Sequence, residues 1–231
     1  MSNFQERLKA VRKRIAAACS RANRNPDEVS ILAASKTRGP DEIKEAADAG
    51  LTIFGENRVQ EAHPKTSLCP GYIEWHMIGH LQRNKVKDAV QLFSMIHSVD
   101  SWKLLETINS ASESAGKTMS VCLEINVSGE GSKFGLAPKE APEILEKSNT
   151  LRNIDIVGLM TMPPFTENTE DTRLFFRRLR ELRDEWRSST NFSLNELSAG
   201  MSNDFEIAIE EGSTCIRLGS ILFGKRTKPK I

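Results

Sequence analysis

The sequence predicts a (β/α)8 barrel of the α/β class, also called a TIM barrel, with an extra helix ahead of the first strand. Its 231 residues fall in the size range that one such barrel fills. Short apolar runs rich in β-branched residues alternate with longer amphipathic, charged stretches, which is the pattern of repeated βα units. No proline-rich, serine-rich or low-complexity linker interrupts this alternation. We therefore expect residues 1–231 to form one domain.

Eight apolar runs are candidates for strands, and eight strands favour a closed barrel over an open doubly wound sheet, which shares the same alternation. The expected strands are 29–35, 51–56, 74–79, 93–99, 119–127, 154–162, 194–200 and 215–223.

The stretches between these runs carry helix signals, because several begin with Pro, Asp or Thr and end at Gly or Asn. Examples are 39–50, 100–116, 137–149 and 169–189. Another amphipathic segment, 3–24, precedes the first strand, and little follows the eighth. We expect this leading helix to cover the barrel where a final helix would otherwise pack.

Composition limits the class of protein. The chain has 32 Lys and Arg against 31 Asp and Glu, so it has no global field to attract nucleic acid or an anionic membrane. It has no long apolar segment typical of a secretory signal or a membrane span. Its four cysteines contain no CxxC pair. We expect a soluble protein of the reducing cytoplasm.

Basic residues gather at both ends of the chain. The leading helix carries Arg7, Lys9, Arg12, Lys13, Arg14, Arg21 and Arg24, and the last residues include Lys225, Arg226, Lys228 and Lys230. We interpret these as solvated surfaces, because few aromatic residues accompany them. An RNA-attracting patch is the weaker alternative.

Lys36 is the first candidate for chemistry. Active sites of barrel enzymes lie at the carboxyl ends of the strands, and Lys36 follows the first apolar run. Period two places it on the face of Leu32 and Ala34. If that face is the barrel interior, desolvation would lower the pKa of the lysine towards the range of a Schiff-base nucleophile. A lysine that reaches solvent from the strand end is the alternative.

The ends of the seventh and eighth strands suit a phosphate, which commonly binds there in such barrels. We place Ser202 at the N-cap of the helix that follows strand seven, with its hydroxyl and nearby N–H groups open to an anion. Gly219 permits close backbone approach, and Ser220 adds a hydroxyl. An ordinary helix cap and a packing glycine are the alternatives for Ser202 and Gly219.

Two further residues point to a ligand. Arg217 shares a face with Gly219, and an unpaired buried arginine is expensive, so we expect a partner in the same cavity. Asn57 ends the second strand and is a candidate ligand contact, with a turn asparagine as the alternative.

His76 and His80 lack a third ligand nearby in sequence, so we predict no metal site. Dinucleotide, P-loop and serine-hydrolase motifs are absent from the sequence.

The chain resembles the pyridoxal phosphate homeostasis protein family, whose barrels are similar to the N-terminal domain of alanine racemase. The matching segments, in order, are AASKT (33–37), FGENRVQE (54–61), WHMIGHLQRNK (75–85), HSVDS (97–101), INVSGEGSKFGL (125–136), GLMTM (158–162), LSAGMSNDFEIAI (197–209) and IRLGSILFG (216–224). Ala199 departs from the pattern, where methionine is usual; this departure does not affect Ser202.

The resemblance implies that the cofactor is pyridoxal 5′-phosphate (PLP), held as a Schiff base on Lys36 with its phosphate near Ser202, Gly219 and Ser220. It also implies that Asn57 lines the cofactor ring and that Arg217 faces the pyridine nitrogen. A fixed cation there disfavours protonation of the ring nitrogen and weakens its use as an electron sink.

The resemblance also separates a carrier from an enzyme. Alanine racemases take a second acid or base from an additional domain of a partner subunit, and we expect no room for that domain after the eighth strand. We therefore expect a monomeric, non-catalytic carrier that buffers PLP, passes it to PLP-dependent apo-enzymes, and has no nucleic-acid or membrane partner. The alternatives are a PLP-dependent amino-acid racemase or decarboxylase of low activity, a Schiff-base aldolase without cofactor, and a nucleic-acid-binding barrel.

Overall fold

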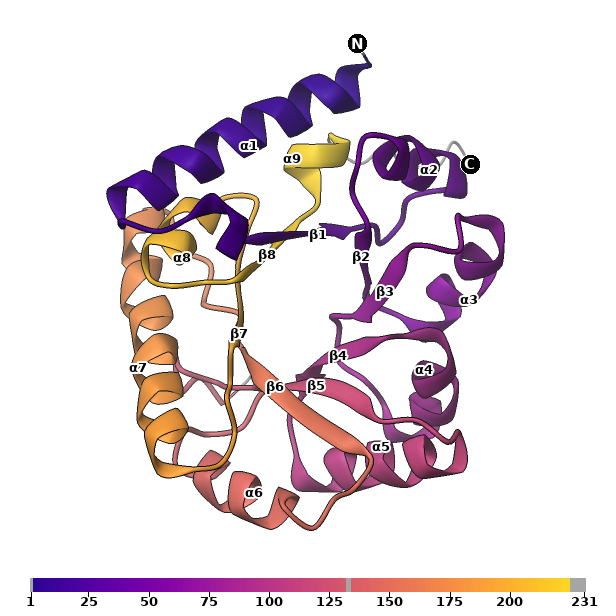
Figure 1. Cartoon of the computed structure of the whole chain (residues 1–231). Coiled ribbons are helices and arrows are strands. Elements are labelled where there is room, and N and C mark those ends of the chain that lie inside the picture. Colours follow the sequence, from indigo (N-terminus) through magenta and orange to yellow (C-terminus); the bar gives the residue numbers. More distant parts are fainter. Residues whose placement is uncertain (1, 132–133, 225–231) are drawn as a thin grey trace.

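The computed structural model describes residues 2–131 and 134–224, and these residues form a closed barrel of eight parallel strands in chain order (Figure 1). The predicted α/β barrel is therefore confirmed. The strands are β1 (Ser30–Ala34), β2 (Ile53–Glu56), β3 (Glu74–Met77), β4 (Met95–Val99), β5 (Met119–Glu124), β6 (Ile154–Met160), β7 (Glu196–Met201) and β8 (Cys215–Leu218). Pairing of β8 with β1 closes the barrel, with Arg217 opposite Leu32.

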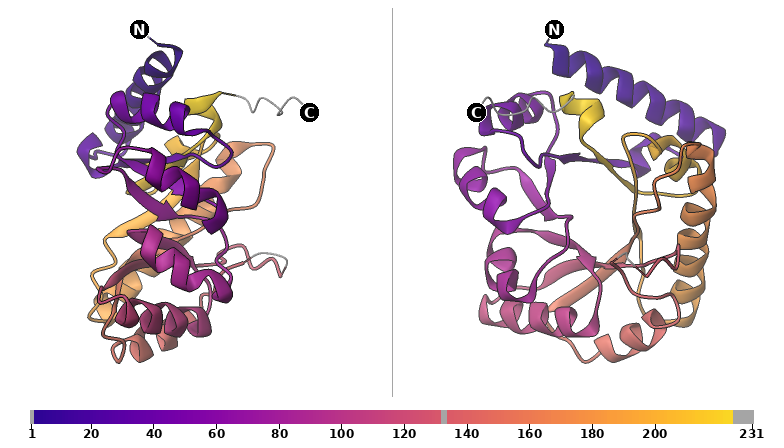
Figure 2. Two further views of the ribbon diagram at one scale, coloured as in Figure 1. Left: turned by 90° about the vertical axis from the view of Figure 1, so that its right-hand side faces the viewer. Right: turned by 180° about the vertical axis from the view of Figure 1, so that it is seen from behind.

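Helices surround the barrel on its outside (Figures 1 and 2). They are α1 (Asn3–Arg21), α2 (Pro40–Asp48), α3 (Val59–Leu68), α4 (Val86–Leu92), α5 (Trp102–Ser114), α6 (Ala141–Ser148), α7 (Arg173–Ser189), α8 (Phe205–Glu210) and α9 (Ser220–Phe223). The amphipathic pattern explains their orientation. In α7, for example, Phe176, Leu179, Leu182 and Trp186 are buried at helical spacing against the strands.

The main core lies between the strands and these helices, and period two decides which strand residues enter it. In β1, Ala33 packs in this outer core, whereas Leu32 and Ala34 belong to a separate cluster with Ile78 and Cys215. The predicted face shared by Leu32, Ala34 and Lys36 is thus the barrel interior.

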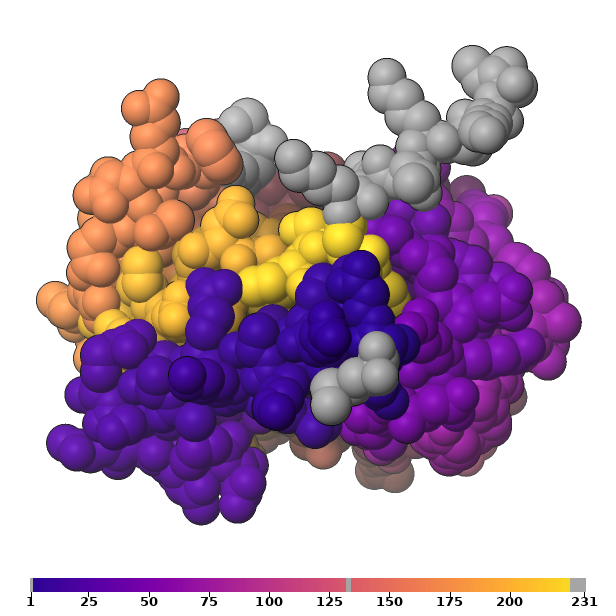
Figure 3. All heavy atoms as spheres, turned by 90° about the horizontal axis from the view of Figure 1, so that it is seen from above, coloured from indigo at the N-terminus to yellow at the C-terminus, as the bar shows by residue number. Residues whose placement is uncertain are grey.

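Helix α1 covers the outside of the barrel beside α8 and α9, as expected for the leading helix (Figure 3). Phe4 packs on Phe223 with ring centroids 5.4 Å apart. An arginine also holds α1 against α8, because Arg14 forms an ion pair with Glu206 at 2.5 Å. Part of the basic surface predicted for this helix therefore serves docking within the chain; the basic residues at 225–230 lie outside the described residues.

Several strands begin or end a few residues away from the predicted bounds, and the end of β8 differs most. The run 215–223 is a strand only as far as Leu218, and Ser220–Phe223 form α9. The cause is local hydrogen bonding, since Leu222 and Phe223 donate backbone N–H groups to the carbonyl of Gly219, whose φ of −114° and ψ of −84° ends the strand. Strand β7 in turn runs one residue further than expected, to Met201.

Two features are absent from the described residues. None of the described helices is long and apolar enough to cross a membrane. Within the same residues, no three His, Cys, Asp or Glu side chains are placed to hold a metal ion.

Candidate functional site

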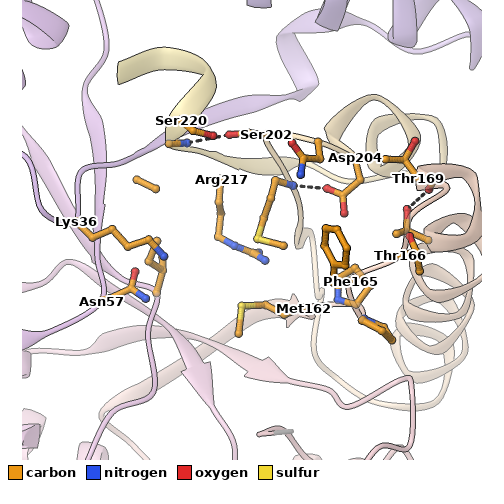
Figure 4. A pocket seen from close by; sticks show the side chains of 18 of the residues that line it. Lys36, Asn57, Met162, Phe165, Thr166, Thr169, Ser202, Asp204, Arg217 and Ser220 are labelled. Carbon is orange, nitrogen blue, oxygen red and sulfur yellow. Dashed lines mark hydrogen bonds between the residues drawn. The ribbon is translucent and has the colours of Figure 1, made fainter. Parts of the chain in front are cut away.

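A cavity of about 400 Å³ opens at the carboxyl ends of the strands, and Figure 4 shows the side chains around it. The structure brings together all six residues that the sequence predicted: Lys36, Asn57, Ser202, Arg217, Gly219 and Ser220. They come from the ends of β1, β2, β7 and β8 and from the first residue of α9. Segments up to 184 positions apart thus meet at one mouth because parallel strands all end on the same side of the barrel.

Lys36 lies in the turn after β1 and extends into the cavity, where it is half-buried (Figure 4). The next residue, Thr37, has a φ of +66°. This left-handed conformation is unfavourable for a β-branched residue, and strained backbone of this kind gathers at functional sites. Thr37 is not among the predicted site residues, because no residue type in this turn indicates a positive φ.

A buried ion pair supports the turn that carries Lys36. The Lys65 ammonium on α3 lies 2.7 Å from Glu56 Oε1 and donates to the Ser35 carbonyl at 3.0 Å. The Ser35 hydroxyl donates to the same carboxylate oxygen at 2.6 Å. These hydrogen bonds and the ion pair therefore link the ends of β1 and β2, next to Lys36 and Asn57 in the chain.

Arg217 is 4% exposed and reaches from β8 into the cavity. Its Nη1 donates to the Ser198 carbonyl at 2.7 Å and to the Ser198 hydroxyl at 2.8 Å, and its Nη2 donates to the Thr161 carbonyl at 2.9 Å. These acceptors are neutral, and none of the described carboxylates forms an ion pair with Arg217. Burial lowers the pKa of the guanidinium, and Glu124 and Asp204 oppose that effect. Arginine remains a cation under these conditions, so positive charge faces the cavity.

Ser202 does not cap α8, contrary to the sequence prediction. The N-cap is Asp204, and its Oδ1 accepts the Met201 N–H at 2.6 Å within the turn. Ser202 lies two residues earlier, where its Oγ accepts the N–H groups of Gly219 at 3.3 Å and of Ile221 at 3.4 Å. The hydroxyl therefore faces the start of α9, and it joins the loops after β7 and β8.

Gly219 and Ser220 place backbone N–H groups at the first turn of α9. Gly219 has no left-handed φ, and a Cβ built on it would meet Ala34 at 3.5 to 3.6 Å, which is an ordinary contact. The fold alone does not demand glycine at this position. Gly200 differs, because its φ is +92° and a Cβ would lie 2.6 Å from the Cβ of Ala208.

Asn57 is half-buried at the end of β2, and its Oδ1 is buried without a hydrogen-bond partner among the described residues. A neighbouring glycine is required for its position, since a Cβ on Gly79 would lie 2.5 Å from the Asn57 carbonyl oxygen. An unpaired buried amide oxygen is costly, so this atom is suited to accept a hydrogen bond from a ligand.

One wall of the cavity comes from the segment between β6 and α7, which contains none of the predicted site residues. Its lining residues include Met162, Phe165, Thr166 and Thr169. Phe165 is 87% exposed, so it stands at the mouth rather than in a core. Only Met162 belongs to one of the matching segments, GLMTM, and the two prolines that follow it disfavour a strand or a helix and indicate a loop.

His76 and His80, the histidines without a third ligand nearby in sequence, have different surroundings. His80 is beside Asp100, with 3.0 Å between Nδ1 and Oδ2, and its ring stacks on Phe134. His76 lies in the barrel interior, where its Nδ1 is 3.0 Å from His97 Nε2. Burial lowers the pKa of His76 to about 4, and it lowers the pKa of His97 well below the ordinary value.

Comparison with known proteins identifies relatives over nearly the full chain. The profile of the family described as "Alanine racemase, N-terminal domain" matches residues 7–227. A pyridoxal phosphate homeostasis protein of Aquifex aeolicus is 45% identical over 97% of this chain and 99% of its own. The human protein of that name is 40% identical over 96% of this chain and 86% of its own.

Solved structures agree with these matches. PipY of Synechococcus elongatus PCC7942, solved with PLP bound, superimposes with a TM-score of 0.85 at 34% identity, covering 96% of this chain and all of the other. An alanine racemase of Clostridium difficile 630 superimposes with a TM-score of 0.75 at 15% identity, covering 99% of this chain but 58% of the racemase, and it shows the fold alone. The sequence matches and the shared barrel together establish that this chain belongs to the pyridoxal phosphate homeostasis protein family.

Proposed function

We propose that the chain binds PLP in the cavity at the barrel mouth, covalently through Lys36, and serves the homeostasis of this cofactor. One observation carries the proposal: an amine, a turn with hydroxyl and backbone N–H groups, and a buried cation face the same cavity, as Lys36, Ser202 with α9, and Arg217. Each of these groups suits one part of PLP, namely the aldehyde, the phosphate and the pyridine ring.

The described residues fit the phosphate. Two backbone N–H groups, of Gly219 and Ile221, converge on the oxygen of Ser202 at distances of 3.3 and 3.4 Å. These hydrogen bonds are long, and donors that converge on one oxygen can be shared with a phosphate oxygen. The hydroxyls of Ser202 and Ser220 would add donors to the same group.

The covalent step needs one amine and one aldehyde. PLP supplies a reactive aldehyde and an electron-withdrawing ring when it is bound. Lys36 Nζ would condense with the aldehyde carbon with the loss of one water molecule. Asn57 Oδ1 would accept a hydrogen bond from the ligand, which would give this buried oxygen the partner that it lacks among the described residues.

We propose that the protein is a carrier rather than an enzyme. Arg217 can only donate hydrogen bonds, so a guanidinium beside the pyridine nitrogen disfavours its protonation and limits carbanion chemistry. A carrier would buffer this aldehyde and release it to PLP-dependent apo-enzymes. We further propose that it works in the cytoplasm as a monomer in which residues 1–231 form one domain, without nucleic-acid or membrane partners.

The first test is the visible absorption spectrum of the protein titrated with PLP, followed by borohydride reduction and peptide mass mapping. We expect a Schiff-base band and a phosphopyridoxyl label on Lys36, both lost in Lys36→Ala. A label on another lysine would contradict the assignment. A colourless protein would instead favour a cofactor-free Schiff-base aldolase.

The second test separates the carrier from an enzyme. The PLP-loaded protein is incubated with individual amino acids, and racemisation and decarboxylation are followed by chiral chromatography and by carbon dioxide release. We expect no saturable turnover. The same loaded protein should activate a PLP-dependent apo-enzyme within a short time after mixing. Lys36→Ala that has been preincubated with PLP and then desalted should not activate it.

A further inference from the structure

A row of four polar side chains crosses the interior of the barrel and ends at the cavity. Arg217 Nη1 lies 2.8 Å from Ser198 Oγ, and Ser198 Oγ lies 2.8 Å from His97 Nδ1. His97 Nε2 lies 3.0 Å from His76 Nδ1, and His76 Nε2 faces Glu74 at 3.9 Å. The residues come from β8, β7, β4 and β3, so the row spans strands that are far apart in sequence.

The direction of the hydrogen bonds in this row is assigned from Arg217 outward, by giving each donor an acceptor. A guanidinium only donates, so Ser198 Oγ accepts from it. A second lone pair of Ser198 Oγ can accept from a protonated His97 Nδ1, but the hydroxyl proton would then have no acceptor among the described residues; we therefore assign that proton to a hydrogen bond with His97 Nδ1. His97 Nδ1 is therefore unprotonated, its proton is on Nε2, and it donates to His76 Nδ1. His76 in turn carries its proton on Nε2, towards Glu74.

Burial keeps both rings neutral. His97 is fully buried and His76 is 7% exposed. Burial lowers the pKa of His76 to about 4. Burial, followed by the charges of His76 and Arg217, lowers the pKa of His97 well below its ordinary value. A neutral imidazole has one donor and one acceptor nitrogen, as this row requires.

We propose that Ser198 and His97 are positioning residues, which hold the Arg217 guanidinium in the orientation that faces the PLP ring. The inference rests on the proposed function. Ser198 Oγ accepts from Arg217 through one lone pair, and donation of its proton to His97 Nδ1 keeps the hydroxyl in the rotamer that faces Arg217. Three of the five N–H donors of Arg217 then bond to the barrel, which leaves Nε and one proton of Nη2 for the cavity.

The arrangement explains why a barrel interior contains two histidines. Interiors of such barrels are usually filled with branched apolar residues, and each buried polar group costs free energy unless it is paired. The row pairs both ring nitrogens of His97 and the hydroxyl of Ser198. Fully paired buried networks favour a single arrangement, and here that arrangement ends on a cavity-lining cation.

The first experiment uses the protein without PLP, so its result does not depend on the proposed function. Two-dimensional NMR of protein labelled with ¹⁵N in its histidine rings reports which ring nitrogen carries the proton. We expect the Nε2–H form for His76 and for His97 throughout the range from pH 6 to 8. An Nδ1–H form of His97 would overturn the proposal.

Ser198→Ala tests, in the same spectra, whether the Ser198 hydroxyl links His97 to Arg217 by hydrogen bonds. We expect the His97 ring signals to move, because Nδ1 loses its donor. The matched control is Ser98→Ala, which removes an equally buried hydroxyl that donates to the Gly79 carbonyl at 2.6 Å without touching Ser198 or Arg217. If the His97 signals move no further in Ser198→Ala than in Ser98→Ala, the hydrogen bond between Ser198 and His97 is refuted.

The second experiment uses PLP and compares two substitutions of His97. His97→Asn keeps an acceptor at the position of Nδ1, because Oδ1 is equally far along the side chain, whereas His97→Leu removes it. We expect His97→Leu to weaken PLP binding about five-fold, as loss of one net hydrogen bond does, and to shift the pH profile of the absorption band. His97→Asn should retain the affinity and the pH profile of the unsubstituted protein.

These outcomes separate the two proposals. If the unsubstituted protein forms no absorption band with PLP, the proposed function fails while the NMR result still decides the hydrogen-bonded row. If the band forms and His97→Leu matches the unsubstituted protein, or His97→Asn loses as much as His97→Leu, the positioning role is refuted. Thermal unfolding of each variant identifies a folding defect. Ser98→Ala is again the control, and we expect its PLP affinity to equal that of the unsubstituted protein.

Discussion

Lys65 and Glu56 form an ion pair at 2.7 Å behind the cavity, with the two side chains 10% and 0% exposed. The pair also binds the Ser35 hydroxyl and carbonyl, so it joins α3 to the ends of β1 and β2. One carboxylate oxygen, Glu56 Oε2, has no hydrogen-bond partner among the described residues. The network is therefore sensitive to the loss of either charge.

Lys65→Met should destabilise the fold strongly, because it leaves the Glu56 carboxylate buried without its cation. We expect a loss of about 3–5 kcal/mol in the free energy of unfolding, measured by urea denaturation. The control is Lys147→Met, which breaks an exposed pair with Glu143 on α6 and should leave stability unchanged within error. Lys65→Met combined with Glu56→Leu should recover part of the loss; a double variant as unstable as the single one would contradict this account.

Gly158→Ala should disrupt the contact between β6 and β7. A Cβ at Gly158 would lie 1.9 Å from the Glu196 carbonyl oxygen, and backbone on both strands would have to move. We expect a loss of about 3 kcal/mol or more in stability, measured by denaturant unfolding. Gly71→Ala is the control, since nothing lies within 4 Å of the added Cβ, and it should change stability by at most about 1 kcal/mol. Equal effects of the two substitutions would contradict the steric explanation.

Ser202→Ala should weaken PLP binding under the proposed function. The hydroxyl joins the β7 and β8 loops and would donate to the phosphate. Hydrogen bonds to charged groups are worth more than neutral ones, so we expect a loss of about ten-fold or more in affinity by absorption titration. Ser94→Ala, which removes a hydroxyl bond to the Trp75 carbonyl at the start of β4, should bind PLP normally. An unchanged affinity in Ser202→Ala would place the phosphate elsewhere.

Glu124 should make stability depend on pH. Burial, followed by the charge of Asp100, raises the pKa of this carboxyl from its ordinary value of 4.5 to about 7. The folded state therefore holds the proton more tightly than the unfolded state. The resulting contribution to stability is present below pH 4.5 and is lost as the pH rises from about 4.5 to about 7.

Glu124→Gln removes this titration. Relative to the unsubstituted protein, we expect the variant to gain stability between pH 5 and pH 8, by on the order of 2–3 kcal/mol. Urea unfolding at the two pH values measures the gain. The control Glu113→Gln, at an exposed position of α5, should show the same difference from the unsubstituted protein at both pH values. A gain no larger for Glu124→Gln than for this control would show that Glu124 is already charged at pH 5.

Hydrophobic periodicity by itself determined the barrel. Each strand and its following helix are specified by local pattern and local turn residues, so the eight runs and the leading helix could be read in order along the chain. The positions of the six candidate site residues followed as well, because parallel strands in a barrel end on one side and Lys36, Asn57 and Arg217 stand at or near those ends.

Tertiary structure decided which groups pair. The Ser202 bonds to Gly219 and Ile221 depend on two loops lying side by side. The pairing of Lys65 with Glu56 likewise joins separate elements, as does the row from Arg217 to His76. Local pattern carries no record of such partners, because hydrogen bonds and ion pairs depend on distances that exist only once the barrel has closed.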